Sequence, residues 1–368
     1  MPTAKPTRLL SLDALRGFDM FWIAGGEEIV HHLAHAKGGS FWEAFAHQLS
    51  HPEWNGLTAY DLIFPLFLFL AGVSTPFSLA NQIAKGADKS VLLKKIIRRG
   101  LILVLLGIIY NNGLEELKPL SEIRFASVLG RIGLAGMFAQ IIYLYTNTRT
   151  QYIWFVALLI GYWAFIMLVP VPGCGAGLMT MACNPASYVD SLIIPGKLYK
   201  IIHDPEGLVS TIPAIGTALL GIFAGNLLRS DKTGIQKVQR LIIAGIGLLV
   251  VGYLWSLVFP LNKNLWTSSF VLVVGGYSAL LLALFYGVID VAGWNRWAWV
   301  LAVIGMNSIL IYMASSFIDF GYTANAIFGW FIKLFSPEYQ KAVHAAIFVF
   351  IEWLMLWFLY KKGVFLKV

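Results

Sequence analysis

The sequence has 368 residues, of which 58% are hydrophobic, 14% aromatic and only 12% charged, and its mean hydropathy is +0.73. This composition excludes an ordinary water-soluble domain and is typical of a protein embedded in a bilayer. The net charge of +8 could suggest a nucleic-acid partner, but charge in a membrane protein has to be placed relative to the bilayer before it indicates a ligand.

Ten apolar runs follow one another along the chain, most of them roughly 18 to 22 residues long, which is the length that crosses about 30 Å of hydrocarbon. They lie near residues 14–33, 58–83, 92–111, 126–146, 151–170, 210–228, 241–260, 267–290, 298–318 and 342–360. Continuous runs of this length exclude barrel strands of about ten alternating residues. The sequence therefore predicts an all-α polytopic membrane protein, a bundle of about ten transmembrane helices that forms a single domain over residues 1–368.

Basic residues gather on one side of this predicted topology. Residues 85–99 and 229–240 hold two basic clusters, whereas the loops assigned to the other face carry most of the acidic residues, which are Glu43, Glu53, Glu115, Glu116, Asp190, Asp204 and Glu206. This asymmetry follows the positive-inside rule and places both termini in the cytoplasm. It also uses most of the excess positive charge, so no nucleic-acid partner is expected.

The first apolar run carries several charges and no small-residue cleavage site, which indicates a retained helix and a mature chain that starts near Met1. Asp13, Arg16 and Asp19 are spaced i, i+3, so they share a helix face and can pair near the cytoplasmic boundary. Glu27 emerges near the opposite boundary, and Glu28 begins an outward loop that runs to Ser50.

The second run is preceded by a group of polar residues in the stretch HPEWNGLTAYDLIFPLF, residues 51–67. Thr58 is placed to cap the helix, and Asp61 then falls within its first turn. A solvated His51, an Asn55-Gly56 turn and a carboxylate favoured by the helix dipole would each be ordinary alone. Together they point to chemistry. Glu27 is expected at roughly the same depth as His51, and a carboxylate oriented toward an imidazole fixes its tautomer and raises its basicity.

Other polar residues need an explanation. Arg131 and Asn307 lie inside apolar runs. A buried arginine requires an anionic partner or a polar cavity, and Asn307 is a lesser case of the same kind. For Arg131, structural pairing and an anionic ligand both remain open. His31 and His35 have i, i+4 spacing, but no carboxylate follows at a fitting offset, so no metal is expected. The 171–209 loop contains Cys174 and Cys183, which form a disulfide or remain two free thiols.

Five blocks in series resemble the transmembrane acyltransferases of the heparan-α-glucosaminide N-acetyltransferase family. They are RLLSLDALRGFDMFWI at 8–23, HPEWNGLTAYDLIFPLFLFLAG at 51–72, IRFASVLGRIGLA at 123–135, DPEGLVSTIPAIGTALLGIFAG at 204–225, and NKNLWTSSFVL at 262–272 followed by GMNSILIY at 305–312. The family's lysosomal member carries a large luminal portion ahead of the first block. That portion has no counterpart in this sequence, which leaves the acceptor open.

The resemblance implies an enzyme that takes an acetyl group from acetyl-CoA, used as a co-substrate on the cytoplasmic side, and delivers it to an amino sugar or glycan on the other side. The family's essential histidine matches His51, which would act as nucleophile or general base. Asn55 is a candidate to stabilise the oxyanion, and Asp61 and Glu27 are candidates to orient the imidazole. Glu27 stands where the lysosomal enzyme has an asparagine, so its role is not simply inherited.

Six further candidates lie elsewhere in the blocks. The candidates along the CoA path are Arg16, Arg131 and Asn307, and those for the acceptor are Asp204, Glu206 and Asn264. Asp204 and Glu206 could equally cap the following helix. A homodimer is also possible, and the protein is expected in a bacterial inner membrane with His51 on the periplasmic or outer face.

Two rival functions remain open from the sequence. One is O-acylation of a surface glycan, since nothing separates an amine from a hydroxyl acceptor. The other is proton-coupled secondary transport, because intramembrane carboxylates and histidines also form proton relays. The acyl length, and the choice between a covalent acetyl-histidine and direct transfer, also stay open.

Overall fold

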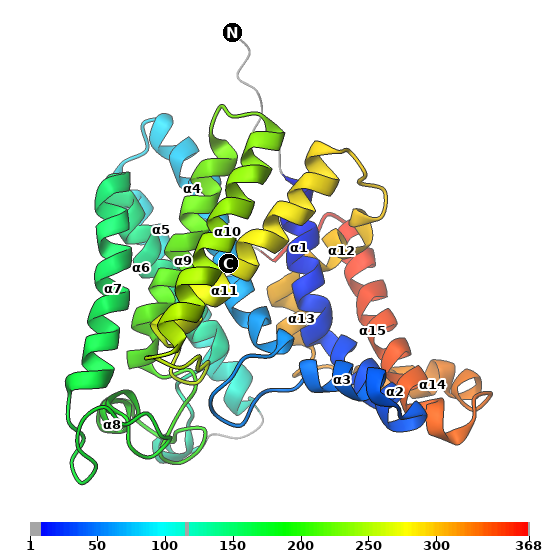
Figure 1. Ribbon diagram of the computed structural model, residues 1–368. Coiled ribbons are helices and arrows are strands. Elements are labelled where there is room, and N and C mark those ends of the chain that lie inside the picture. Colours follow the sequence, from blue (N-terminus) through cyan, green and yellow to red (C-terminus); the bar gives the residue numbers. More distant parts are fainter. Residues whose placement is uncertain (1–8, 115–117, 367–368) are drawn as a thin grey trace. The chain divides into compact units, whose positions relative to one another are not determined.

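The computed structural model describes residues 9–114 and 118–366, and within these ranges every regular element is helical (Figure 1). Two isolated β-bridges, between Arg124 and Gly196 and between Val171 and Gly175, are the extended pairings found there. The charged ends of the chain, at residues 1–8 and 367–368, and the acidic pair Glu115 and Glu116 lie outside the described residues. The all-α prediction is confirmed.

The described chain divides into two compact units. Residues 9–52, 58–63 and 281–366 form the first unit, and residues 53–57 and 64–280 form the second. Whether all 368 residues act as one functional domain stays a prediction. The helices of the first unit are α1 (Leu10–Phe21), a π-helical turn (Trp22–Gly26), α2 (Glu27–Lys37), α3 (Ser40–Gln48), a 3₁₀ turn (Ala59–Leu62), a second π-helical turn (Gly287–Val291), α12 (Ala298–Gly305), α13 (Ser308–Ala314), α14 (Phe320–Ile332) and α15 (Pro337–Lys361).

The second unit contains most of the long helices. They are α4 (Ile63–Ala84, its first residue in the other unit), α5 (Lys89–Asn112), a 3₁₀ turn (Leu120–Glu122), α6 (Val128–Tyr145), α7 (Thr148–Leu168), α8 (Pro185–Ile193), α9 (Leu208–Arg229), α10 (Gly234–Ser256) and α11 (Ser268–Tyr286, which ends in the first unit).

Seven helical segments of the described chain are long and apolar enough to cross a membrane. They are Ala59–Ala84, Val128–Tyr145, Thr148–Leu168, Leu208–Arg229, Gly234–Ser256, Ser268–Val291 and Pro337–Lys361. Each matches one of the ten predicted runs, so a multi-pass membrane protein is confirmed. The total of about ten spans and the orientation of the termini stay predictions.

The other three runs differ from simple spanning helices for identifiable reasons. The run at 14–33 is interrupted by a π-helical turn in which Gly25 has a φ of 114°, a backbone angle that favours glycine. The run at 92–111 forms α5, whose first half carries Lys94, Lys95, Arg98 and Arg99. The run at 298–318 is split into α12 and α13 at Asn307.

The predicted outward loop from Glu28 to Ser50 was wrong in one respect, because the chain there forms two helices. Residues 27–37 are rich in helix-forming Ala, Leu, Glu and Lys, so they continue the helical path. Gly38 and Gly39, with φ values of 61° and 92°, then separate α2 from α3.

In the first unit, α1 packs directly against α12 through glycines (Figure 1). A Cβ added at Gly17 would lie 1.8 Å from the carbonyl oxygen of Leu301, and one added at Gly305 would lie 1.9 Å from that of Asp13. Only glycine permits this approach, which is a usual way for membrane helices to associate.

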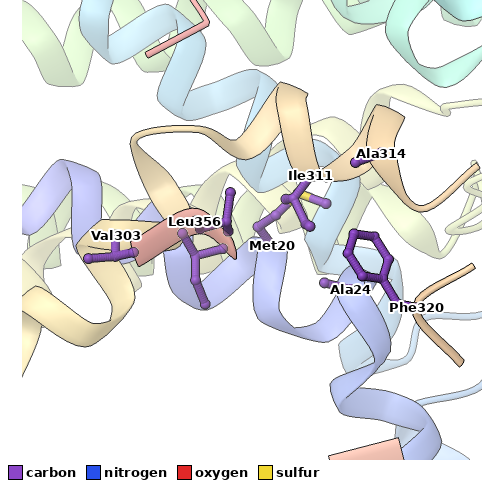
Figure 2. Close-up of a cluster of buried hydrophobic side chains, with 8 residues drawn as sticks. Met20, Ala24, Val303, Ile311, Ala314, Phe320 and Leu356 are labelled. Carbon is purple, nitrogen blue, oxygen red and sulfur yellow. The ribbon is translucent and has the colours of Figure 1, made fainter. Parts of the chain in front are cut away.

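Apolar side chains from several segments converge beside this contact (Figure 2). Met20 and Ala24 meet Ile311 and Phe320 there, and Leu356 comes from α15. This core joins α1 to α13, α14 and α15, so segments about 300 residues apart in the sequence form one unit.

In the second unit, α9 is the central helix and packs against α6, α7 and α8. The most apolar stretch of α9 is 83% buried inside the protein, whereas the corresponding stretches of α7 and α10 are 22% and 17% buried. A Cβ added at Gly221 of α9 would lie 2.0 Å from the carbonyl oxygen of Phe69, so α4 also approaches α9 closely. The unit therefore has a tightly packed centre and open outer helices.

Candidate active site

His51 pairs with Asp61 at the start of the second predicted span. The imidazole Nδ1 lies 2.7 Å from the carboxylate Oδ1, and the side chain of His51 is 49% exposed whereas that of Asp61 is 1% exposed. An ionised carboxylate only accepts hydrogen bonds, so this contact favours an imidazole that is protonated at Nδ1. His51 is therefore an accessible imidazole that is oriented by a buried carboxylate.

The helix start itself holds Asp61 in place. Thr58 and Asp61 form a capping box, in which the backbone N–H of Thr58 donates to the second carboxylate oxygen at 3.2 Å. The Thr58 hydroxyl also donates to the carbonyl oxygen of Ser50 at 2.7 Å. The predicted cap is confirmed. Thr58 also connects Ser50, the residue before His51, to the helical turn that carries Asp61.

Tyr60 and Glu27 complete the surroundings of the imidazole within the first unit. The ring of Tyr60 lies 4.8 Å from that of His51 between centroids, at an angle of 43°. The Tyr60 side chain is hydrogen-bonded to the Glu27 carboxylate. Glu27 therefore connects to this group through Tyr60, while Asp61 makes the direct contact with the imidazole.

The turn that follows His51 in the sequence is fixed by hydrogen bonds within the second unit. The indole N–H of Trp54 donates to the carbonyl oxygen of Met179 at 2.6 Å, and the N–H of Gly56 donates to that of Leu261 at 2.9 Å. The turn-like character predicted for residues 54–56 is confirmed, and two distant loops hold it.

Asn262 determines how the Asn55 amide is oriented. The backbone N–H of Leu265 donates to Asn262 Oδ1 at 2.8 Å, so Asn262 Nδ2 lies on the other side of its amide group. That nitrogen can only donate, and it lies 2.9 Å from Asn55 Oδ1. Asn55, which is exposed, consequently directs its own NH₂ group away from Asn262.

The two acidic residues of the DPEG block are joined to Arg124. Asp204 accepts from Arg124 Nε at 2.8 Å and Nη2 at 2.7 Å, and also from the backbone N–H groups of Tyr199 and Glu206 at 3.0 Å each. Arg124 Nη2 further contacts Glu206 Oε2 at 2.5 Å. Asp204 is buried and accepts four hydrogen bonds, but it does not cap α9, whose N-cap residue is Gly207. Its role toward the acceptor stays a prediction.

Arg131 is buried inside the second unit. Its Nη2 donates to the carbonyl oxygen of Gly207 at 3.3 Å and to the hydroxyl of Ser210, and its guanidinium lies 4.8 Å from the Trp266 ring centroid. Nε and Nη1 are buried without a hydrogen-bond partner among the described residues. Structural pairing is thus present, and a role toward an anionic ligand stays a prediction.

Two buried titratable groups lie near this network, outside the spanning helices. Burial raises the pKa of Asp190 to about 6, although the backbone N–H of Val209 donates to its Oδ1 at 3.1 Å. Burial lowers the pKa of His203 to about 4, and its Nδ1 lies 2.7 Å from the Ser187 hydroxyl. For Asp204, burial raises the pKa, but hydrogen bonds and charge from Arg124 outweigh it, and the pKa lies below its ordinary value.

The remaining candidates make other contacts. Arg16 Nη1 is 3.4 Å from Asp13 Oδ1, whereas the Asp19 carboxylate has no hydrogen-bond partner in the described part of the chain. The Asn307 side chain bonds the backbone near the C-terminus, at Val364 and Leu366. Asn264 lies half-buried in the loop between α10 and α11.

The histidines of α2 and the two cysteines have defined surroundings. His31 Nε2 lies 3.3 Å from the carbonyl oxygen of Leu49, and His32 pairs with Glu28 at 3.5 Å. Over residues 9–114 and 118–366, no group of three or more His, Cys, Asp or Glu side chains is placed to hold a metal ion. Cys174 and Cys183, which the sequence left either bonded or free, form a disulfide.

Sequence reasoning missed Asn262 and Arg124 as site-forming residues. Both stand inside blocks that carried the resemblance, NKNLWTSSFVL and IRFASVLGRIGLA, only two and seven residues from the chosen Asn264 and Arg131. Arg124 precedes the apolar run and looks like an ordinary interfacial charge. Its partners lie 80 and 82 residues away, and no local pattern indicates that pairing.

Together, the long apolar helices define a multi-pass membrane protein, in which an exposed imidazole is hydrogen-bonded to a buried carboxylate. The family model described as heparan-alpha-glucosaminide N-acetyltransferase, catalytic, matches residues 8–259. The chain belongs to this family of membrane N-acetyltransferases.

Two curated relatives share that description. The heparan-alpha-glucosaminide N-acetyltransferase of Homo sapiens is 27% identical over 427 aligned positions, which cover 100% of this chain and 61% of the human protein. That of Mus musculus is 28% identical over 423 positions, covering 98% of this chain and 62% of the mouse protein. The chain therefore spans about three fifths of the length of these relatives.

Proposed function

We propose that this protein transfers an acetyl group from acetyl-CoA to the amine of a glucosamine-like sugar on the opposite side of the membrane. The observation that carries the proposal is the 2.7 Å contact between His51 Nδ1 and Asp61 Oδ1. The His51 side chain is 49% exposed and its carboxylate partner is buried, an arrangement that supports nucleophilic or general-base chemistry at the imidazole. Membership of an N-acetyltransferase family supports the reaction class.

In the covalent form of the mechanism, Nε2 attacks the thioester carbon, the C–S bond breaks and CoA leaves as the thiolate. Asp61 stabilises the positive charge that develops on the acetylated imidazole. The acceptor amine then attacks the acetyl carbon, the C–N bond to the imidazole breaks, and the proton lost by the amine is matched by the proton that the thiolate takes up. In the direct form, Nε2 removes that proton while the amine attacks the thioester itself.

Asn55 is proposed as a donor to the oxyanion of either intermediate. Its orientation supports this role, because Asn262 occupies the carbonyl side of the amide and leaves the NH₂ group to donate. Arg16, Arg131 and Asn307 remain proposals for the CoA path, and Asp204, Glu206 and Asn264 remain proposals for the acceptor. Acetyl-CoA would meet the basic face of the protein, where the basic segments 85–99 and 229–240 favour its phosphates.

The proposed topology places both termini and the basic segments 85–99 and 229–240 in the cytoplasm. The His51 segment then lies on the opposite side of a bacterial inner membrane. The positive-inside distribution of Lys and Arg supports this orientation. A disulfide between Cys174 and Cys183 also supports it, because disulfides persist in oxidising compartments.

The direct test is to incubate the purified protein with acetyl-CoA and glucosamine and to measure CoA and N-acetylglucosamine. Both products should appear in equal amounts. Acetylation of a hydroxyl with the amine left intact would favour the O-acyltransferase alternative. Proton-coupled uptake into proteoliposomes without release of CoA would favour a transporter and reject the proposal.

A further inference from the structure

A large apolar groove lies between α7 and α10, over a floor of α9 and α11, entirely within the second unit. Its volume is about 960 Å³, at the upper end of the range for small-molecule sites. Val156 and Ile160 on α7 and Val251 on α10 line it and remain exposed, so it opens sideways between the two helices. Figure 1 shows α7, α9 and α10 running alongside one another.

The groove has two polar ends and an apolar middle. Arg240, near the start of α10, is the charged residue among those that line it. Trp255 and Trp163 line its other end with ring centroids 6.3 Å apart, and the indole N–H of Trp163 is buried without a hydrogen-bond partner among the described residues. Between Arg240 and Trp255, α10 rises roughly 22 Å at 1.5 Å per residue.

These dimensions fit a lipid better than a compact ligand. One leaflet contributes about half of the ~30 Å hydrocarbon layer, so a groove of this length accommodates extended acyl chains. An arginine near a helix end reaches toward the interface, where it meets phosphate groups. Arg240 also follows the short connection between α9 and α10, where Arg229 and Lys232 draw anionic headgroups to the same leaflet.

We propose that this groove is a binding site for an anionic glycerophospholipid, with its acyl chains along α10 and its phosphate on Arg240. The site is distinct from the His51 pair and does not depend on the proposed acetyl transfer. Burial of the acyl chains supplies contacts that the open sides of α7 and α10 lack. The guanidinium supplies the preference for negative charge.

Gly247 provides a way to fill the groove without disturbing the fold. It lines the groove on α10, and a Cβ added there meets no atom within 4 Å. Gly247→Leu therefore occupies the lipid's place and also raises helix propensity. Gly161→Leu is the matched control, because Gly161 lies on α7 with the same open surroundings but does not line the groove.

The test is native mass spectrometry of the whole protein released from nanodiscs that contain phosphatidylglycerol and phosphatidylcholine with identical chains. The wild type should retain at least one lipid, with phosphatidylglycerol enriched about fivefold over its bulk fraction, as one arginine at a membrane surface provides. Arg240→Gln should keep the lipid but lose the enrichment, and Gly247→Leu should lose the lipid. Gly161→Leu and Lys237→Gln, the latter a charge change outside the groove lining, should behave as the wild type.

Three results would overturn the proposal. One is unchanged lipid retention by Gly247→Leu. Another is an enrichment that survives Arg240→Gln or falls equally with Lys237→Gln, which would indicate diffuse surface charge. The third is a dimer that Gly247→Leu abolishes, since the groove would then hold a second copy of the chain.

Discussion

The imidazole of His51 and the carboxylate of Asp61 are joined by a 2.7 Å hydrogen bond, although the two residues are ten positions apart in the sequence, with a turn between them. The same carboxylate caps a helix through Thr58. One residue thus begins the helix and sets the tautomer of the histidine, so local folding and the proposed chemistry depend on one contact.

Asp61→Asn should separate these two roles. An amide can donate to Nδ1 and so stabilise the wrong tautomer, and we expect kcat to fall roughly 10³-fold or more with the KM for acetyl-CoA little changed. Thr58→Ala is the control, because it removes the cap at a cost of about 1 kcal/mol in stability but leaves the carboxylate in place. Equal activity losses in steady-state assays of the two variants would assign Asp61 a purely structural role.

Asn262→Asp should reverse the Asn55 amide. A carboxylate at position 262 still accepts the Leu265 N–H but also accepts from the Asn55 NH₂ group, which is then withdrawn from any oxyanion. We expect kcat to fall about 10²-fold, as when one oxyanion donor is removed. Asn55→Ala should lose a similar amount, and the double variant should lose little more. Additive losses in this double-mutant cycle would refute the link.

His203 and Asp190 should make stability depend on pH in opposite directions. The pKa of His203 falls to about 4 on folding, so its contribution is complete above pH 6.5 and is lost as the pH falls toward 4. The pKa of Asp190 rises to about 6, so its carboxyl favours the folded state at low pH, and that contribution is lost as the pH rises from about 4 to 6.

Between pH 6 and 4 the two effects should nearly cancel in the wild type. Melting temperatures of His203→Gln should then rise on acidification relative to the wild type, and those of Asp190→Asn should fall. Each difference corresponds to up to about 3 kcal/mol at 1.36 kcal/mol per pKa unit. Parallel pH profiles for both variants would contradict these pKa shifts.

The disulfide offers a test of the proposed orientation. After reduction, Cys174 and Cys183 should react with a membrane-impermeant maleimide added outside intact cells. A single cysteine introduced at Asp231, in a chain whose native cysteines are replaced by serine, should react only after the membrane is permeabilised. The reverse pattern would invert the topology.

Much of the fold could be predicted because lipid imposes strong local constraints. The spanning helix at 208–229 was visible as one apolar run, since every residue of such a helix must suit hydrocarbon or another helix. The break at Gly25 was not visible, because a glycine inside an apolar run is also compatible with an intact helix.

The candidate site divides in the same way. Thr58 and Asp61 could be assigned from spacing, because a capping box is local. Asn262 and Asn55 are 207 residues apart, and Arg124 and Asp204 are 80 apart, so their pairing depends on tertiary packing. Single-sequence periodicity carries no information about such contacts.

The most direct test of the central claim is acetyl transfer by His51→Ala in proteoliposomes with acetyl-CoA and glucosamine, with correct folding checked by the melting temperature. We predict that the wild type releases CoA and forms N-acetylglucosamine, and that the variant, equally stable, forms none above background. N-acetylglucosamine formation by His51→Ala at the wild-type rate would contradict the role of this histidine.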